Sequence, residues 1–207
     1  LGLLAALGAW AYLRAPITPA AWEPPAAPPL EGPTAANDLL GNADHLGEGL
    51  IPGPEDVAVD AQGRVYGGTS DGRIVRLTPA EGGKWSAETF ASTGGRPLGL
   101  AMAPDGRLLA AVADVGLVLI DPRGKTRALV QSVDGEAVRV ADGLDVSSEG
   151  VVYFSDASSR FPLSQYRLDL LEGRPHGRLL RYDLQTGRAS LVLPGLYFAN
   201  GVALSKD

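Results

Sequence analysis

Residues 141–156 read ADGLDVSSEGVVYFSD, and this stretch decides the fold. Leu144 and Val146 alternate with their neighbours at a period of two, which is typical of a half-buried strand. Glu149-Gly150 supplies the positive φ that a tight hairpin needs, and an apolar run follows it. The stretch therefore predicts two antiparallel strands joined by a glycine turn.

Copies of this pattern open at Gly53, Pro97 and Ala199, and a third strand and a weaker fourth follow the hairpin in each complete unit. Four-stranded units that recur at intervals of about 40 to 50 residues are typical of β-propeller blades. The sequence therefore predicts an all-β fold, a β-propeller. We expect blades near residues 53–93, 96–133 and 140–195, and the start of the next at 198–207.

A closed propeller needs at least about four blades, so we expect about three blades of a larger ring in this chain. An insertion at residues 158–175 lengthens the third unit. Its apolar residues favour a short amphipathic helix near residues 164–172. Such a helix would either cap the central channel or pack over the rim of the blade.

The chain carries a formal net charge of −6 and has no cysteine. A nucleic-acid-binding protein normally presents a basic face to phosphates, so we expect no nucleic-acid partner. The lack of cysteine excludes disulfides, thiolate metal sites and a cysteine nucleophile. The expected partner is a small-molecule substrate, and nothing in the sequence indicates an oligomeric state.

An uncharged apolar run extends from Leu1 to Leu13 and ends at Arg14. A helix that spans a bilayer takes about 20 residues, so this run alone is too short. We interpret residues 1–15 as a truncated membrane anchor, with a signal-peptide core or a short interfacial helix as alternatives.

A linker follows, with seven prolines between Pro16 and Pro33. Proline at this density favours an extended chain, so residues 16–40 are expected to form a stiff stalk. The partial propeller would then occupy residues 41–207. We expect the protein to be anchored in a membrane by its N-terminus, with the propeller outside the cytosol, or in a lumen or periplasm.

The innermost strands of a propeller line its central channel, so residues just before these strands converge at one face. If the first strand of each unit is innermost, four positions converge there. They are Glu55, Leu98, Asp142 and Asn200. Two carboxylates and an amide at one point form the ligand set that a hard cation such as calcium selects. The alternative is that Asp142 and Asn200, each followed by glycine, only start hairpin turns.

Several segments resemble one known family. In chain order they are DASSRF at residues 156–161, LEG at 171–173, GRLLRYD at 177–183 and GLYFANGVALS at 195–205. Together they resemble the strictosidine synthase-like family, and in particular its adipocyte plasma membrane-associated protein branch. The resemblance extends over roughly residues 40–207 and is densest from residue 141 onward. It implies a propeller that is six-bladed when complete and has a single N-terminal anchor.

The wider superfamily implied by this resemblance includes gluconolactonases and paraoxonases, which hydrolyse lactones or esters with calcium or a similar divalent ion in the channel. Their glutamate ligand, from a Pro-Glu motif, matches Glu55, and an asparagine ligand matches Asn200. A second family asparagine is absent, because the aligned pair is Ala141-Asp142. The resemblance thus implies a metal site at Glu55, Asn200 and Asp142. We expect Leu98, Ala141 and Phe198 to contact the substrate around this site.

The resulting hypothesis is a metal-assisted hydrolase of small esters or lactones. One alternative is a non-catalytic binding propeller, and another is a strictosidine synthase-type enzyme that condenses an amine with an aldehyde, a lyase. Glu55 with Asn200 favours the hydrolase, whereas Ala141 favours the two alternatives. The catalytic residues themselves are not identified by the sequence.

Two further patterns are interpreted as structural. Residues 68–72 read GTSDG, which fits the G-x-S-x-G pattern of serine hydrolases. That motif needs a helix after the serine, whereas the next residues alternate like a strand, so a hairpin turn is expected. His45 and His176, the two histidines of the chain, are expected to be loop residues.

Overall fold

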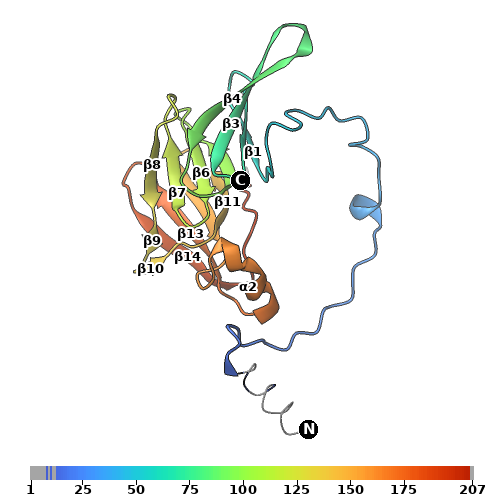
Figure 1. The fold of residues 1–207 in the computed structure, drawn as a ribbon, viewed down its shortest axis with the longest axis vertical. Coiled ribbons are helices and arrows are strands. Elements are labelled where there is room, and N and C mark those ends of the chain that lie inside the picture. The colour runs from blue at the N-terminus through green and yellow to red at the C-terminus, as the bar shows by residue number, and fades with distance from the viewer. Residues whose placement is uncertain (1–7, 9, 11–12, 206–207) are drawn as a thin grey trace.

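The computed structural model of the 207-residue chain describes residues 8, 10 and 13–205. Most of the predicted apolar N-terminal segment, residues 1–15, therefore lies outside the described residues. Among the described residues, no helix is long and apolar enough to cross a membrane. The following residues, up to the first sheet, form a largely extended chain that makes a wide loop on one side of the body (Figure 1), with a few turns and one short 3-10 helix, η1, at Gly32–Thr34.

The body consists of three four-stranded antiparallel sheets, each an up-and-down meander of consecutive strands. The first sheet comprises β1 Val57–Val59, β2 Val65–Gly68, β3 Arg73–Pro79 and β4 Trp85–Ser92. The second comprises β5 Pro97–Met102, β6 Leu108–Val112, β7 Gly116–Ile120 and β8 Thr126–Val130. The third comprises β11 Ala141–Val146, β12 Val151–Asp156, β13 Gly177–Asp183 and β14 Ala189–Leu196.

Smaller elements connect these sheets. A two-stranded ribbon, β9 Ser132–Val133 with β10 Glu136–Ala137, separates the second sheet from the third. A 3-10 turn, η2 Glu81–Gly83, joins β3 to β4. The insertion between β12 and β13 folds into η3, Leu163–Gln165, and the helix α2, Tyr166–Glu172 (Figure 1). The predicted amphipathic helix is therefore confirmed, although its first turn is a 3-10 turn.

Glycines form the predicted hairpin turns. Gly106 and Gly150 have φ of 80° and 81°, a left-handed conformation that glycine adopts without a steric penalty. Gly72 has φ of 88° in the turn between β2 and β3, immediately after Ser70 and Asp71. The GTSDG segment is thus a hairpin turn, as its strand-like continuation predicted.

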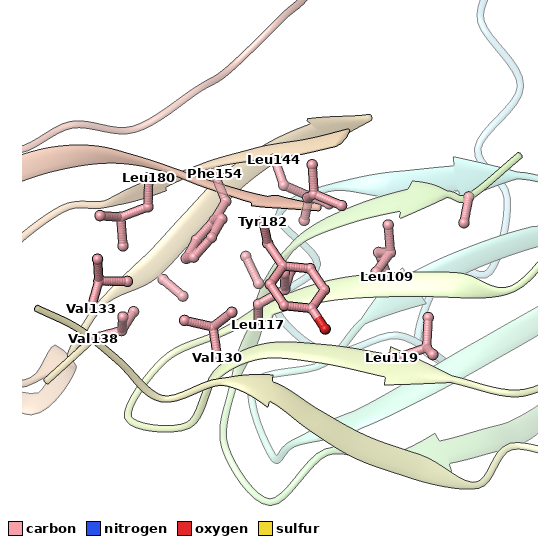
Figure 2. Close-up of a cluster of buried hydrophobic side chains, with 14 residues drawn as sticks. Leu109, Leu117, Leu119, Val130, Val133, Val138, Leu144, Phe154, Leu180 and Tyr182 are labelled. Atoms are coloured by element: carbon pink, nitrogen blue, oxygen red, sulfur yellow. The ribbon is translucent and has the colours of Figure 1, made fainter. Parts of the chain in front are cut away.

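The core lies between neighbouring sheets. The largest cluster joins the second and third sheets, with Leu109 and Leu117 facing Phe154, Leu180 and Tyr182 (Figure 2). A second cluster packs the first sheet against the second. Each fully buried leucine or phenylalanine contributes about 1.5–3 kcal/mol, so these contacts hold the sheets together face to face.

One predicted strand is not formed. Residues 201–205, which the repeat pattern identifies as the first strand of another unit, belong to no sheet in the described part of the chain. The segment still follows β11, because the Leu204 amide donates a hydrogen bond to Asp145 Oδ2 at 2.8 Å. A strand requires a hydrogen-bonded neighbour, and in the described part of the chain no strand pairs with residues 201–205.

Candidate functional site

A pocket of about 280 Å³ lies where the inner strands begin. Its walls come from the second and third sheets, from the segments just before β1 and β5, from the α2 insertion and from the C-terminal segment. They comprise Glu55, Arg96, Leu98, Asp142, Leu163, Tyr166, Phe198 and Asn200. The four positions expected to converge on a propeller axis therefore line one pocket, although they are far apart in the sequence.

Close approach of the inner strands brings these residues together. Gly99 follows Leu98, and a Cβ atom on Gly99 would lie 2.2 Å from the carbonyl oxygen of Asp142. Gly143 follows Asp142, and a Cβ there would lie 2.7 Å from the carbonyl oxygen of Asn200. Only glycine permits backbones to approach this closely, so each glycine allows its strand to lie against the next site-bearing segment.

A hydroxyl group links two of the segments that carry the site. Ser155 Oγ on β12 accepts a hydrogen bond from the Gly143 amide at 3.0 Å and donates one to the Asn200 carbonyl oxygen at 2.6 Å. The backbones next to Asp142 and at Asn200 are thus held by the same side chain. Sequence reasoning missed Ser155, because its position in a strand does not show that it bridges two units.

Asp142 is the buried acid of the pocket, with 5% of its surface exposed. Burial, reinforced by the nearby Glu55 carboxylate and opposed by Arg96, raises the pKa of Asp142 to about 7. Glu55 is more exposed, and its pKa is also raised, chiefly by desolvation. The pocket therefore holds more negative charge than its single arginine compensates.

Arg96 is the cation of the pocket. Its Nη2 donates to the Gly53 carbonyl oxygen at 3.3 Å, and its Nε is buried with no hydrogen-bond partner among the described residues. Sequence reasoning did not include Arg96 in the site. The available signal was its position directly before Pro97-Leu98, where the second unit begins.

The apolar wall comes from two separate parts of the chain. Phe198 has φ of 45°, and its ring centroid lies 6.3 Å from that of Tyr166 at the start of α2. Leu163 lies beside them in the wall and packs with Leu98. The insertion thus contributes directly to the pocket, which distinguishes it from a helix that only covers the rim.

Ala141, expected to contact the substrate, does not line this pocket. It is fully buried in the core cluster between the second and third sheets. In β11, Ala141 pairs with Asp156 of β12, and a bulge separates it from the regular pairing at Leu144. Adjacent residues of a strand point to opposite faces, so Asp142 reaches the pocket while Ala141 packs inside.

His45, His176 and Ser70 of the GTSDG segment do not line this pocket. His176 Nε2 is 2.7 Å from Glu172 Oε2 in the insertion, and His45 lines a separate hollow beside the first sheet. Ser70 lies in the β2–β3 turn. Within the described part of the chain, no three His, Cys, Asp or Glu side chains are grouped closely enough to hold a metal ion. A metal in the pocket would therefore need the Asn200 amide in addition to the two carboxylates.

Antiparallel four-stranded sheets whose inner strands meet around a polar pocket define a propeller-type protein. The fold is similar to that of a gluconolactonase from Xanthomonas campestris, with a TM-score of 0.55 and 16% sequence identity. The similarity covers 70% of this chain and 48% of that protein.

The chain belongs to the strictosidine synthase-like family. The family model described as strictosidine synthase-like, N-terminal, matches residues 32–77, and the model described as strictosidine synthase matches residues 142–207. STRICTOSIDINE SYNTHASE-LIKE 4 of Arabidopsis thaliana is 38% identical over 86% of this chain and 50% of its own length. Adipocyte plasma membrane-associated protein of Rattus norvegicus is 32% identical over 97% of this chain and 57% of its own length. The chain thus spans about half the length of these curated relatives.

Proposed function

We propose that this chain forms the pocket-bearing part of a hydrolase that acts on small esters or lactones with the help of a divalent cation. The observation that carries the proposal is the pocket shared by Glu55, Asp142 and Asn200. These residues supply two carboxylates and an amide oxygen, the donor types that calcium prefers. The similarity to a gluconolactonase concerns the fold and is compatible with this chemistry without establishing it.

The charge of the pocket supports a cation there. The pKa values of Glu55 and Asp142 are both raised, because the nearby positive charge of Arg96 does not offset the burial of their carboxylates and the repulsion between them. A divalent ion would relieve the burial penalty of Asp142 and its repulsion from Glu55. The donor set therefore fits calcium, with Glu55, Asp142 and Asn200 as the residues that would hold it.

The remaining residues suggest how a substrate is held. When bound, the cation would polarise the substrate carbonyl and stabilise the oxyanion that develops during hydrolysis. Leu98, Leu163 and Phe198 form an apolar wall suited to the carbon skeleton of a lactone or ester. Arg96 can donate hydrogen bonds to a substrate oxygen, and the pocket would have to admit the water molecule that attacks the carbonyl carbon and releases the alcohol group.

A panel of lactones and aryl esters, assayed on the full-length protein with and without chelator, tests this function. We expect chelator-sensitive hydrolysis that Glu55→Gln and Asp142→Asn reduce by at least about a hundredfold, as for removal of a main electrostatic contributor. Glu48→Gln, which neutralises an exposed acid outside the pocket, should leave the rate unchanged. Hydrolysis that persists in both pocket variants and in chelator would refute the proposal.

Arg96 supports a second candidate, a binding propeller without metal. A guanidinium next to two carboxylates is an internal counter-ion, so such a pocket can exist without a bound cation. In that case calcium at millimolar concentration would leave the melting temperature unchanged, whereas the hydrolase proposal expects it to rise. A condensing enzyme of the strictosidine synthase type is the third candidate, and it would join an amine and an aldehyde without calcium.

We also propose that the protein is attached to a membrane through residues 1–15, with the propeller outside the cytosol or in a lumen. The adipocyte plasma membrane-associated protein relatives support this proposal by their name. Alkaline carbonate extraction of membranes from cells that make the full-length protein tests it. Release of the protein into the soluble fraction would contradict an integral anchor.

A further inference from the structure

The N-terminal stalk is docked on the insertion helix. The Thr18 amide donates to the Glu172 carboxylate at 2.7 Å, and the Ala20 amide donates to the Glu172 carbonyl oxygen at 2.8 Å. Arg174 Nε donates to the Thr18 carbonyl oxygen at 2.7 Å. These bonds join segments more than 150 residues apart in the chain, and we call this contact the stalk clamp.

The Glu172 carboxylate, at the centre of the clamp, is fully buried and has several hydrogen-bond and charged partners. Besides Thr18, it contacts Arg160 Nη1 at 3.0 Å and His176 Nε2 at 2.7 Å. A buried carboxylate persists where charged and hydrogen-bonding partners surround it. Glu172 therefore holds the stalk, α2 and the loop after α2 together.

The polarity of α2 is inverted relative to a helix that faces water. Its buried residues are the acids Asp169 and Glu172, with 2% and 0% of their surfaces exposed. Leu170 and Leu171 are instead 54% and 66% exposed. A helix on a water-facing surface normally buries its leucines and exposes its acids. The two buried acids have partners inside the protein: the Ser158 hydroxyl donates a hydrogen bond to Asp169, and the stalk clamp binds Glu172. The buried side of α2 is therefore polar, and Leu170 and Leu171 lie on its exposed side.

The charge around these leucines is positive. Arg160, Arg167 and Arg174 are exposed, whereas the two acids between residues 157 and 176 are both buried. Arg160 is paired with Glu172, so the positive charge on the outside of the insertion comes from Arg167 and Arg174, in a chain whose net charge is −6. Exposed leucines bordered by arginines are the composition of a segment that lies in the interface of an anionic bilayer.

The clamp extends this surface to the stalk. Leu13 and Trp22 flank the docked residues Thr18 and Ala20 and are 81% and 73% exposed. Figure 1 shows the N-terminal segment passing beside α2 at the same end of the molecule. The stalk next to the clamp and the outer side of α2 therefore both carry exposed apolar side chains.

We propose that the stalk clamp, the exposed residues Arg167, Leu170 and Leu171 of α2, and Arg174 in the loop after α2 form one surface that rests on an anionic lipid bilayer. Membrane contact is then made by the body of the protein as well as by any N-terminal anchor. Because Leu163 and Tyr166 of the same insertion line the pocket, the bilayer would lie close to the pocket.

Site-specific labelling of the full-length protein tests this surface directly. This chain has no cysteine, so in a full-length protein whose remaining cysteines, if present, are replaced by serine, Leu171→Cys can carry a polarity-sensitive fluorophore, with Leu40→Cys in the exposed stalk as the matched control. The probes are vesicles of phosphatidylcholine alone and of phosphatidylcholine mixed with phosphatidylserine. We expect a blue shift of the label at residue 171 on the anionic vesicles, and none at residue 40. An unshifted label at residue 171 would overturn the proposal.

Vesicle affinity supplies a second measurement. Leu170→Gln with Leu171→Gln should weaken binding to the anionic vesicles about tenfold, and Arg167→Gln about fivefold, as expected for one basic residue near such a surface. Leu39→Gln with Leu40→Gln is the control, since these leucines are even more exposed. If the α2 variants instead dissociate an oligomer and leave vesicle binding intact, a second copy of the chain covers the face. Neither readout involves catalysis, so this proposal can fail independently of the hydrolase.

Discussion

Two buried acids of this protein have opposite surroundings. Glu172 is fully buried, and an amide, an arginine and a histidine contact its carboxylate, so its pKa is lowered despite burial. Asp142 is almost as buried, yet its carboxylate has no hydrogen bond in the described part of the chain, and its pKa is raised to about 7. The comparison shows that the fold supplies hydrogen-bond and charged partners to the Glu172 carboxylate and leaves the Asp142 carboxylate with only the nearby charge of Arg96, as the proposed cation site requires.

The largest loss of stability is expected at Glu172. Glu172→Leu removes the acceptor for Thr18 and leaves Arg160 and His176 without their partner, so the free energy of unfolding should fall by about 3 kcal/mol. Urea denaturation of the full-length protein measures this change, with Glu48→Leu as the exposed control. A loss no larger than that of the control would show that the clamp does not stabilise the fold.

Removing the charge of Asp142 should have the opposite effect and stabilise the folded protein. Because its pKa is higher in the folded protein than in the unfolded chain, folding favours its protonated form, and its ionisation lowers stability as pH rises from about 4 to 7. Asp142→Asn should therefore raise the free energy of unfolding by about 4 kcal/mol at pH 8 and leave it nearly unchanged at pH 4.

Urea denaturation at the two pH values, without added metal, measures these free energies of unfolding. The Glu172 carboxylate depends on pH in the reverse sense, because its pKa is lower in the folded protein than in the unfolded chain. Its stabilising contribution is present above about pH 4.3, the pKa in the unfolded chain, and is lost as the pH falls through the lower pKa of the folded protein. If Asp142→Asn destabilises the protein equally at both pH values, Asp142 is a satisfied structural acid like Glu172.

Calcium binding should depend on the protonation of Asp142. A proton and a cation compete for the same carboxylate, so the calcium dissociation constant should rise about fivefold from pH 7 to pH 6. Isothermal titration calorimetry in two buffers of different ionisation enthalpy would also detect the released proton. A dissociation constant that does not change with pH would place the ion away from Asp142.

The smallest effect is expected at Ser155, which links the backbones on either side of the pocket. Ser155→Ala removes one acceptor and one donor, so stability should fall by about 1 kcal/mol, with a modest loss of calcium affinity. Ser190→Ala, on the exposed strand β14, is the matched control. An unchanged calcium affinity would mean that Asp142 and Asn200 need no such link.

Much of the sheet architecture could be predicted from the repeat. The period-two alternation and the glycine turns identified the hairpins, including the turn that resembles a serine hydrolase motif. The strand expected at Val202–Leu204 did not form, since alternation measures a preference for extended chain and pairing requires a neighbour. Ala141 was misplaced relative to the pocket, because sequence position alone did not determine which of two adjacent residues points inward.

The local sequence by itself determined the strands, their turns and the positions at which polar side chains recur. Only the tertiary structure decided that Arg96 and Tyr166 join Asp142 in one pocket, and that Glu172 binds the stalk. The physical reason is that strand propensity acts between near neighbours, whereas burial and charge compensation depend on which distant segments fold against each residue.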